Sequence, residues 1–248
     1  MRKHIILSVG MPRAGTGWFH NITQILVLAA GGVLANDIRE KYNLGRFLTE
    51  VNCNIGSVSS YRILPVVAPL LFEPNYVIKL HGERKPLADL LIESGLIKST
   101  FIYRDPRDAA LSIYEYGQTA SKHDYVNNDF AHIRSIEEAI DYISPYIEIA
   151  RGWISSRRVF TVKYEDMFIN FDEIINELLS FLEIDLELEE GLKLIEEFRP
   201  GINVVNRRFT HFKKGKVGRY KEHFSPDQIK LCNDRFGPFL AEQGYQET

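Results

Sequence analysis

Three basic side chains and one histidine stand at the ends of short apolar runs in this sequence: Arg13, Lys79, His81 and Arg104. Guanidinium and ammonium groups bind phosphate and sulfate oxygens through short, charge-assisted hydrogen bonds. If the apolar runs are strands of one parallel sheet, their carboxyl ends meet at one edge, where such sheets bind ligands. The side chains would then gather around a bound anionic group. Taken alone, a single histidine after a strand is more often structural than catalytic.

The stretch from Ile5 to Trp18, IILSVGMPRAGTGW, has the form of an anion cradle. Its β-branched apolar start predicts a buried strand, its glycines and Pro12 predict a turn, and a helical pattern begins at Thr16. Backbone N–H groups and the positive end of the helix dipole then point at one place, which suits a phosphate or sulfate group. Arg13 adds a fixed positive charge. Many α/β folds begin in this way, so the stretch alone leaves phosphate binding open.

Apolar strands that alternate with helical patterns predict a single α/β domain from residue 1 to 248, with a three-layer, mostly parallel central sheet flanked by helices. Asp105 and Ser225 are expected to cap helices, because each is followed by proline. Between residues 31 and 74 we expect short helices and loops. Strands are expected at 5–9, 76–80, 99–103 and 159–164, and helices at 16–30, 86–96, 105–116, 135–153 with a break at Pro145, 171–182, 186–198 and 225–241.

Composition and charge argue against several classes of function. At 248 residues, with 45% hydrophobic and 25% charged residues, the chain has the composition of a globular protein. Its net charge of −3 argues against a general nucleic-acid binder. Cys53 and Cys232 are the only cysteines, too few for a disulfide framework or a zinc site. The apolar stretches are too short to cross a bilayer, so we expect a cytoplasmic protein without a membrane span.

Four motifs resemble those of the sulfotransferases that use 3′-phosphoadenosine 5′-phosphosulfate (PAPS). MPRAGTGW at 11–18 resembles the family's loop for the 5′-phosphosulfate, and YRDPRDAALSIYEY at 103–116 resembles its motif for the 3′-phosphate. VKYEDM at 162–167 is similar to the strand whose tyrosine approaches the adenine, and FKKGKVGRYKEHF at 212–224 is similar to the C-terminal loop. Their order and spacing match the family, with a Lys-x-His between the first two.

The resemblance implies a P-loop-like nucleotide-binding core and transfer of a sulfuryl group from PAPS to a hydroxyl or amine, leaving 3′-phosphoadenosine 5′-phosphate (PAP). His81 would be the general base, Lys79 would stabilise the transferring group, and Arg13 would hold the 5′-phosphosulfate. No metal is expected, because cationic side chains take the part that Mg²⁺ has in kinases. The residues implied to bind PAPS, with Trp18 and Tyr164 beside the adenine, are Arg13, Ala14, Gly15, Thr16, Gly17, Trp18, Arg104, Ser112, Tyr164, Lys213, Lys214 and Gly215.

The acceptor stays open, and a small molecule or a glycan is expected. Residues 31–75 and 117–135 would form much of its pocket. The chain departs from the cytosolic members of the family at Arg13, where they usually have lysine. Their short dimerisation motif has no counterpart at 221–230, which leaves the oligomeric state open.

Two alternative interpretations belong to other classes. The first is a P-loop kinase or NTPase. Gly10 and Gly15 have the spacing of the two glycines in the P-loop motif, but Thr16-Gly17 stands where that motif requires Lys followed by Ser or Thr. The second alternative is a catalytically inactive scaffold of the same fold.

Several other residues are expected to be structural. Four histidines have no ligand-like spacing and are expected at the surface or in loops: His20, His123, His132 and His223. Five aromatic residues are expected in the core by default, although one or two of them would line the acceptor pocket: Phe47, Tyr61, Phe72, Tyr114 and Tyr116.

Overall fold

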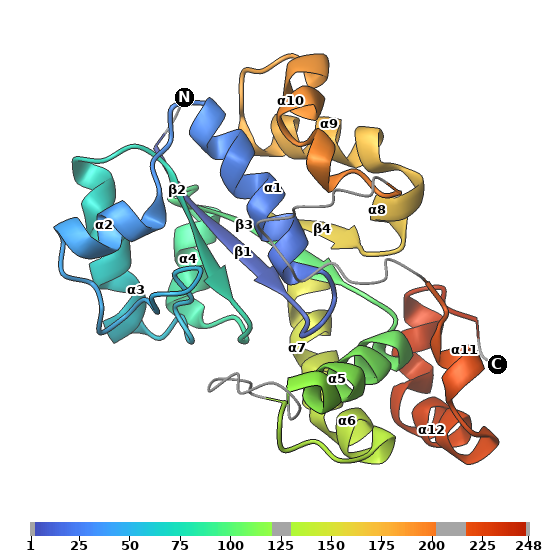
Figure 1. The fold of residues 1–248 in the computed structure, drawn as a ribbon. Coiled ribbons are helices and arrows are strands. Elements are labelled where there is room, and N and C mark those ends of the chain that lie inside the picture. The colour runs from blue at the N-terminus through green and yellow to red at the C-terminus, as the bar shows by residue number, and fades with distance from the viewer. Residues whose placement is uncertain (1–2, 121–129, 202–216, 247–248) are drawn as a thin grey trace.

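The computed structural model describes residues 3–120, 130–201 and 217–246 (Figure 1). The centre of this described part is a sheet of four parallel strands in the order β2-β1-β3-β4. Every expected strand is present, and the parallel sheet flanked by helices confirms the predicted fold class. The strands are β1 (Ile5–Gly10), β2 (Tyr76–Leu80), β3 (Ile97–Tyr103) and β4 (Val159–Lys163).

Helices cover both faces of the sheet and make the outer two of three layers (Figure 1). The first of them, α1 (Thr16–Ala29), follows β1 and packs against β1 and β2. The remaining helices, with short 3-10 helices labelled η, are α2 (Ala35–Lys41), α3 (Ser60–Val67), η1 (Ala68–Leu71), α4 (Pro86–Glu93), α5 (Pro106–Ala120), α6 (Ile136–Ile143), α7 (Pro145–Ile154), α8 (Asp166–Ile169), α9 (Phe171–Leu182), α10 (Leu188–Leu194), η2 (Glu196–Phe198), α11 (Tyr220–His223) and α12 (Pro226–Glu242).

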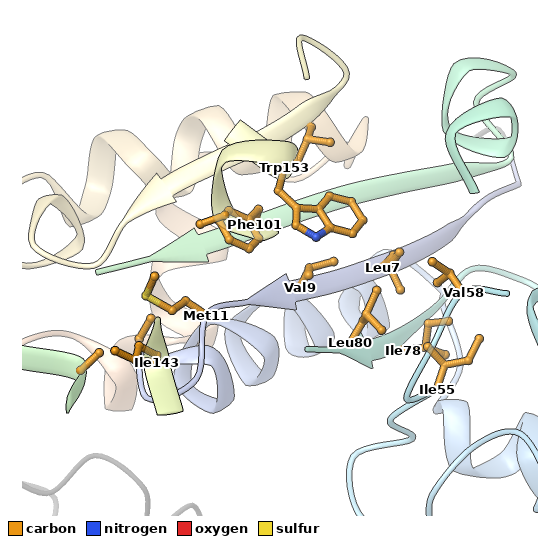
Figure 2. Packing of buried hydrophobic residues seen from close by; sticks show 14 of the residues in the cluster. Leu7, Val9, Met11, Ile55, Val58, Ile78, Leu80, Phe101, Ile143 and Trp153 are labelled. Carbon is orange, nitrogen blue, oxygen red and sulfur yellow. The ribbon is translucent and has the colours of Figure 1, made fainter. Parts of the chain in front are cut away.

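The strands are apolar at successive positions because each face of the sheet is buried. β1 is buried at every residue, and its alternate side chains enter two different cores. Ile6 and Ile102 pack with side chains of α1 and α9 on one face. Leu7 and Phe101 pack on the other face, where Trp153 of α7 also lies (Figure 2). Two cores on opposite faces make the sheet a rigid base for the residues at its edge.

The register of the sheet brings the carboxyl ends of all four strands to one edge. Ser8 of β1 pairs with Lys79 of β2, and Tyr103 of β3 pairs with Lys163 of β4. β1 also pairs with β3 along its whole length. The residues that follow the strands therefore lie near one another, as the sequence predicts.

Local sequence signals mark the starts of three helices, α6, α7 and α12. The hydroxyl of Ser135 accepts a hydrogen bond from the N–H of Glu138 at 3.2 Å, at the start of α6. Ser225 and Gln228 form a capping box at the start of α12. Pro145 is the first residue of α7, so the expected long helix is broken there.

The prediction that Tyr61 and Phe72 lie in the core is wrong. The exposed fraction is 68% for Tyr61 and 75% for Phe72. Tyr61 lies on α3 and Phe72 follows η1, where short helices and a proline leave too little periodicity to show which side faces inward. Among the described residues, no helix combines the length and the apolar character that crossing a membrane requires.

Candidate functional site

The loop between β1 and α1, residues 11–15, is a tight turn held by its own backbone. The N–H of Met11 donates to the carbonyl of Ile102 on β3 at 3.0 Å, and the N–H of the buried Ala14 donates to the carbonyl of Met11 at 3.2 Å. The hydroxyl of Thr16 donates to the same Met11 carbonyl at 3.1 Å. This loop therefore places the N-terminus of α1 at the carboxyl edge of the sheet, where N–H groups and the helix dipole favour an anion.

Two glycines allow this loop to pack closely. Gly15 caps α1 with a φ of 80°, in the left-handed region that favours glycine. A Cβ atom on Gly15 would lie 2.7 Å from Cδ2 of Tyr164, and one on Gly10 would lie 2.5 Å from Cγ2 of Thr16. Gly17 is half-buried on the first turn of α1. The loop therefore contacts the residue that follows β4, and the first and third motifs form one site.

Arg13 and Arg104, which are predicted to bind different phosphates, lie close to each other. Nε of Arg13 donates to Oγ of Ser112 at 3.2 Å, and its Cζ atom lies 4.3 Å from the ring centre of Tyr116. Cζ of Arg104 lies 4.3 Å from the ring centre of Tyr164. Burial lowers the pKa of Arg13, and the positive charge of Arg104 lowers it further. A bound anion would relieve this repulsion.

Asp108, a buried carboxylate missing from the predicted site, holds Arg104 in place. Nη2 of Arg104 donates to Oδ2 of Asp108 at 3.1 Å. The backbone N–H groups of Gly218 and Tyr220 donate to Oδ2 at 2.7 Å and to Oδ1 at 3.0 Å. Asp108 thus joins the 3′-phosphate motif to the C-terminal motif. The only sequence signal for it is the spacing of one helical turn from Arg104.

His81 follows β2 and lies beside loop 11–15. Its Nδ1 atom lies 2.8 Å from the carbonyl oxygen of Gly10. Because a carbonyl oxygen only accepts, Nδ1 carries the proton, and Nε2 keeps its lone pair in the neutral ring. Burial and the charge of Lys79 lower the pKa of His81 to about 4. At pH 7 the ring is therefore neutral and able to accept a proton at Nε2.

Lys79 is half-buried, whereas the other four residues of β2 are buried. Burial and the positive charge of Arg13 lower its pKa to about 8, so it is a cation at pH 7. Within the described residues, neither Lys79 nor Arg13 forms an ion pair with a carboxylate. The two side chains make this end of the sheet electropositive.

The prediction that His20 lies at the surface or in a loop is wrong. His20 lies on α1 and is 2% exposed. Burial, with the nearby charge of Lys79, lowers its pKa to about 3, so its ring is neutral. His20 is one helical turn after the buried Thr16, but helical spacing alone does not show which face of α1 lies on the sheet. His132 and His223 are exposed, as predicted, and His123 lies outside the described residues.

Trp18 is packed into the core on the α1 face of the sheet. It is 6% exposed, and its Nε1 atom donates to the carbonyl of Phe198 at 2.9 Å. Its ring centre lies 5.9 Å from that of Tyr164, edge to face. Trp18 and Tyr164 are therefore neighbours, and their contact with an adenine stays a prediction.

The C-terminal basic motif is described only at its far end. Lys213, Lys214 and Gly215 lie outside the described residues, so their contact with a 3′-phosphate stays a prediction. Arg219 forms an ion pair with Glu115 of α5, in which Nη1 lies 2.9 Å from Oε2. This ion pair and Asp108 fasten the end of the motif to the helix that carries Ser112.

Comparison with known proteins identifies the family. Residues 2–244 match the family model described as the sulfotransferase domain. The chain is 25% identical over 177 residues to an amine sulfotransferase of Oryctolagus cuniculus, an alignment that covers 63% of this chain and 58% of that protein. It is 23% identical to cytosolic sulfotransferase 16 of Arabidopsis thaliana, over 98% of this chain and 76% of the relative.

Solved structures show the same fold. The structure of mouse sulfotransferase SULT7A1 complexed with PAP matches with a TM-score of 0.63 and 15% identity, over 97% of this chain and 86% of the mouse chain. Retinol dehydratase in complex with androsterone and PAP matches with a TM-score of 0.60 and 17% identity, over 97% of this chain and 81% of the other. The family match extends over all four strands of the sheet and the residues at their ends, and this chain therefore belongs to the sulfotransferase family.

Proposed function

We propose that this protein transfers a sulfuryl group from PAPS to the hydroxyl or amine of an acceptor. The observation that carries the proposal is the convergence of Arg13, Lys79 and Arg104 on the turn before α1, next to the neutral ring of His81. The charge of Arg104 lowers the pKa of Arg13, and the charge of Arg13 lowers the pKa of Lys79. Cations gathered in this way at a helix N-terminus suit a ligand with several negative charges. The PAP bound in the structures of SULT7A1 and retinol dehydratase supports the same ligand.

The proposed donor site has two anionic ends. Loop 11–15 with Arg13 holds the 5′-phosphosulfate, and Arg104 with Ser112 holds the 3′-phosphate, together with Lys213, Lys214 and Gly215. Trp18 and Tyr164 lie beside the adenine. The bond between Arg13 and Ser112, at 3.2 Å, supports this assignment because it joins the two anion-binding motifs. The proposal includes no metal ion.

The proposed transfer step is an in-line displacement at sulfur. The acceptor oxygen or nitrogen attacks the sulfur, and the bond between sulfur and the 5′-phosphate oxygen breaks. Nε2 of His81 takes the acceptor's proton, and PAP leaves with the electron pair of the broken bond. Arg13 and Lys79 stabilise the negative charge on the transferring and bridging oxygens.

The direct test of this function measures PAP production from PAPS with and without acceptors. A panel of phenols, alkyl alcohols, amines and monosaccharides covers the open acceptor classes. We expect PAP to form at a rate that depends on one of these acceptors. Formation of ADP from Mg-ATP, with no PAP from PAPS, would favour the kinase alternative. If neither PAP nor ADP forms with any acceptor of the panel, the inactive scaffold would be favoured.

The pH dependence of kcat/KM for PAPS follows from the pKa values of the free enzyme. The pKa of His81 is lowered to about 4, so the general base is lost as the pH falls through that value. The pKa of Lys79 is lowered to about 8, so its charge is lost as the pH rises through that value. We expect a plateau between these two limits, measured by PAP formation with PAPS and acceptor both below their KM values.

Lys79→Arg is the matched variant for the alkaline limb. A guanidinium stays protonated throughout the measurable range, so we expect the decline near pH 8 to disappear while the acid limb stays in place. An alkaline limb that is unchanged in Lys79→Arg would show that another group titrates there.

For the acceptor we propose a small molecule, which agrees with the retinol and androsterone bound in structures of retinol dehydratase. We also propose that residues 1–248 act as one sulfotransferase domain in the cytoplasm, as the name of the cytosolic relative from Arabidopsis thaliana suggests.

A further inference from the structure

The residues that follow α12 fold back onto the carboxyl end of β4 and onto the first turn of α5, the helix that follows β3. We call residues 243–246 the C-terminal strap. Its backbone accepts two hydrogen bonds: Nζ of Lys163 donates to the carbonyl of Gln243 at 2.7 Å, and Nη2 of Arg107 donates to the carbonyl of Gln246 at 3.0 Å. Tyr245 of the strap is half-buried between these two contacts. The strap therefore touches Lys163 at the end of β4 and Arg107 on the first turn of α5.

Glu165 connects the strap to both of these strand ends. The hydroxyl of Tyr245 donates to Oε2 of Glu165 at 3.0 Å, and the backbone N–H of Asp105 donates to Oε1 at 3.1 Å. Glu165 is 8% exposed, and a buried carboxylate needs such donors. In the chain, Glu165 follows Tyr164 directly and Asp105 follows Arg104 directly. The carboxylate of Glu165 thus links the residue next to Tyr164 with the backbone of the residue next to Arg104.

Arg107 makes a second link between the strap and Asp105. Its Nε atom lies 3.0 Å from Oδ1 of Asp105, and its Nη2 atom lies 2.8 Å from Oδ2. The same Nη2 group donates to the strap at Gln246. Arg107 is 1% exposed, so this ion pair is screened from water. Strap, Arg107, Asp105, Glu165 and Tyr245 therefore form a closed ring of contacts beneath the site.

Arg104 and Tyr164, the two residues that this ring of contacts supports, also contact each other. The guanidinium of Arg104 lies over the ring of Tyr164, with 4.3 Å between Cζ and the ring centre. The N–H of Tyr164 donates to the carbonyl of Tyr103 at 2.8 Å, so the two strand ends are joined by backbone as well. A displacement of either strand end would change the relative position of the guanidinium and the aromatic ring, which the nucleotide needs together.

We propose that Tyr245 is a positioning residue of the nucleotide site, which acts through Glu165 to hold Arg104 and Tyr164 in the arrangement that binds the 3′-phosphoadenosine group. The inference rests on the proposed function, because it takes PAP and PAPS as the ligands. The strap then affects the affinity for PAPS and PAP and takes no part in the transfer step.

Tyr245→Phe removes one hydroxyl and keeps the ring. Hydrogen bonds to charged groups are worth enough to change an equilibrium by about tenfold or more. We therefore expect the Kd for PAP, measured by calorimetry, and the KM for PAPS to rise about tenfold. At saturating PAPS, kcat should stay within about twofold of the unmodified protein, since the reacting groups are untouched.

Tyr42→Phe is the matched control. The hydroxyl of Tyr42 donates to Oε1 of Glu73 at 2.6 Å, the same kind of bond, but Glu73 precedes β2 at the opposite edge of the sheet. This variant should leave the Kd for PAP unchanged. An equal loss of PAP affinity in both variants would assign the effect to general destabilisation and overturn the proposal.

A double-mutant cycle tests whether Tyr245 acts through Glu165. Tyr245→Phe should weaken PAP binding in the unmodified protein and have little further effect in a Glu165→Ala background. Glu165→Gln can keep both hydrogen bonds, with the tyrosine hydroxyl now accepting, and should retain most of the affinity. If the unmodified protein binds PAP and Tyr245→Phe binds it with the same Kd, this inference alone is overturned. If the unmodified protein does not bind PAP, the proposed function is overturned as well.

Discussion

Replacement of His81 by alanine is expected to lower kcat by about 10²- to 10⁴-fold, the usual contribution of a general base. The hydrogen bond from Nδ1 to the carbonyl of Gly10 fixes the ring and leaves Nε2 free to take the acceptor's proton. The Kd for PAP should stay within about twofold, because the base meets the acceptor and not the nucleotide. Steady-state rates at saturating PAPS, together with PAP titrations, give both quantities.

Lys193→Ala provides the control for this prediction. Lys193 of α10 is exposed and lies outside the residues expected to bind donor or acceptor, so its removal should change neither kcat nor PAP affinity. If His81→Ala turns over as fast as Lys193→Ala, His81 has no part in proton transfer. If His81→Ala loses PAP affinity as strongly as turnover, the imidazole supports the loop and is not the base.

Arg13→Ala is expected to lower kcat by about 10²- to 10³-fold, the usual cost of removing one group that stabilises charge in the transition state. The side chain lies on the turn before α1 and donates to Ser112, and burial with the charge of Arg104 already lowers its pKa. A developing negative charge on the transferring group would be stabilised most by this cation. Single-turnover rates with PAPS measure the effect without product release.

Two further variants separate charge from structure. Arg13→Lys keeps the positive charge with a different donor geometry, and should recover the rate to within about tenfold. Arg157→Ala removes an exposed arginine that precedes β4, outside the residues expected to form the acceptor pocket, and should leave the rate unchanged. Equal rates in Arg13→Ala and Arg157→Ala would exclude Arg13 from the reaction.

The strand ends and their residues could be predicted because the relevant signals are local. A short apolar run followed by a glycine turn, or by Arg104 and Asp105, shows both a buried strand and the side chains after it. Parallel pairing then brings these ends together without further information. The placement of Arg13 near Ser112 and Arg104 therefore follows from strand periodicity and from the order of the motifs.

The supporting residues could not be predicted because they depend on long-range contacts. Asp108 meets Gly218 and Tyr220, which are more than a hundred residues away in the sequence. Glu165 meets Tyr245 across 80 residues, and nothing in the sequence around either residue indicates this contact. Burial of His20 depends on how α1 lies on β2. Motifs identify the groups that meet a ligand, but the groups that hold them appear only in the folded chain.

Thermal unfolding with PAP tests the central claim, a donor site for a 3′-phosphorylated adenine nucleotide, most directly. A ligand at a hundred times its Kd stabilises a protein by about 2.7 kcal/mol, which raises the Tm of a chain of this size by roughly 5–10 °C. We expect this rise with PAP, a much smaller one with 5′-ADP, which lacks the 3′-phosphate, and none with Mg-ATP. A rise with Mg-ATP and none with PAP would contradict the account.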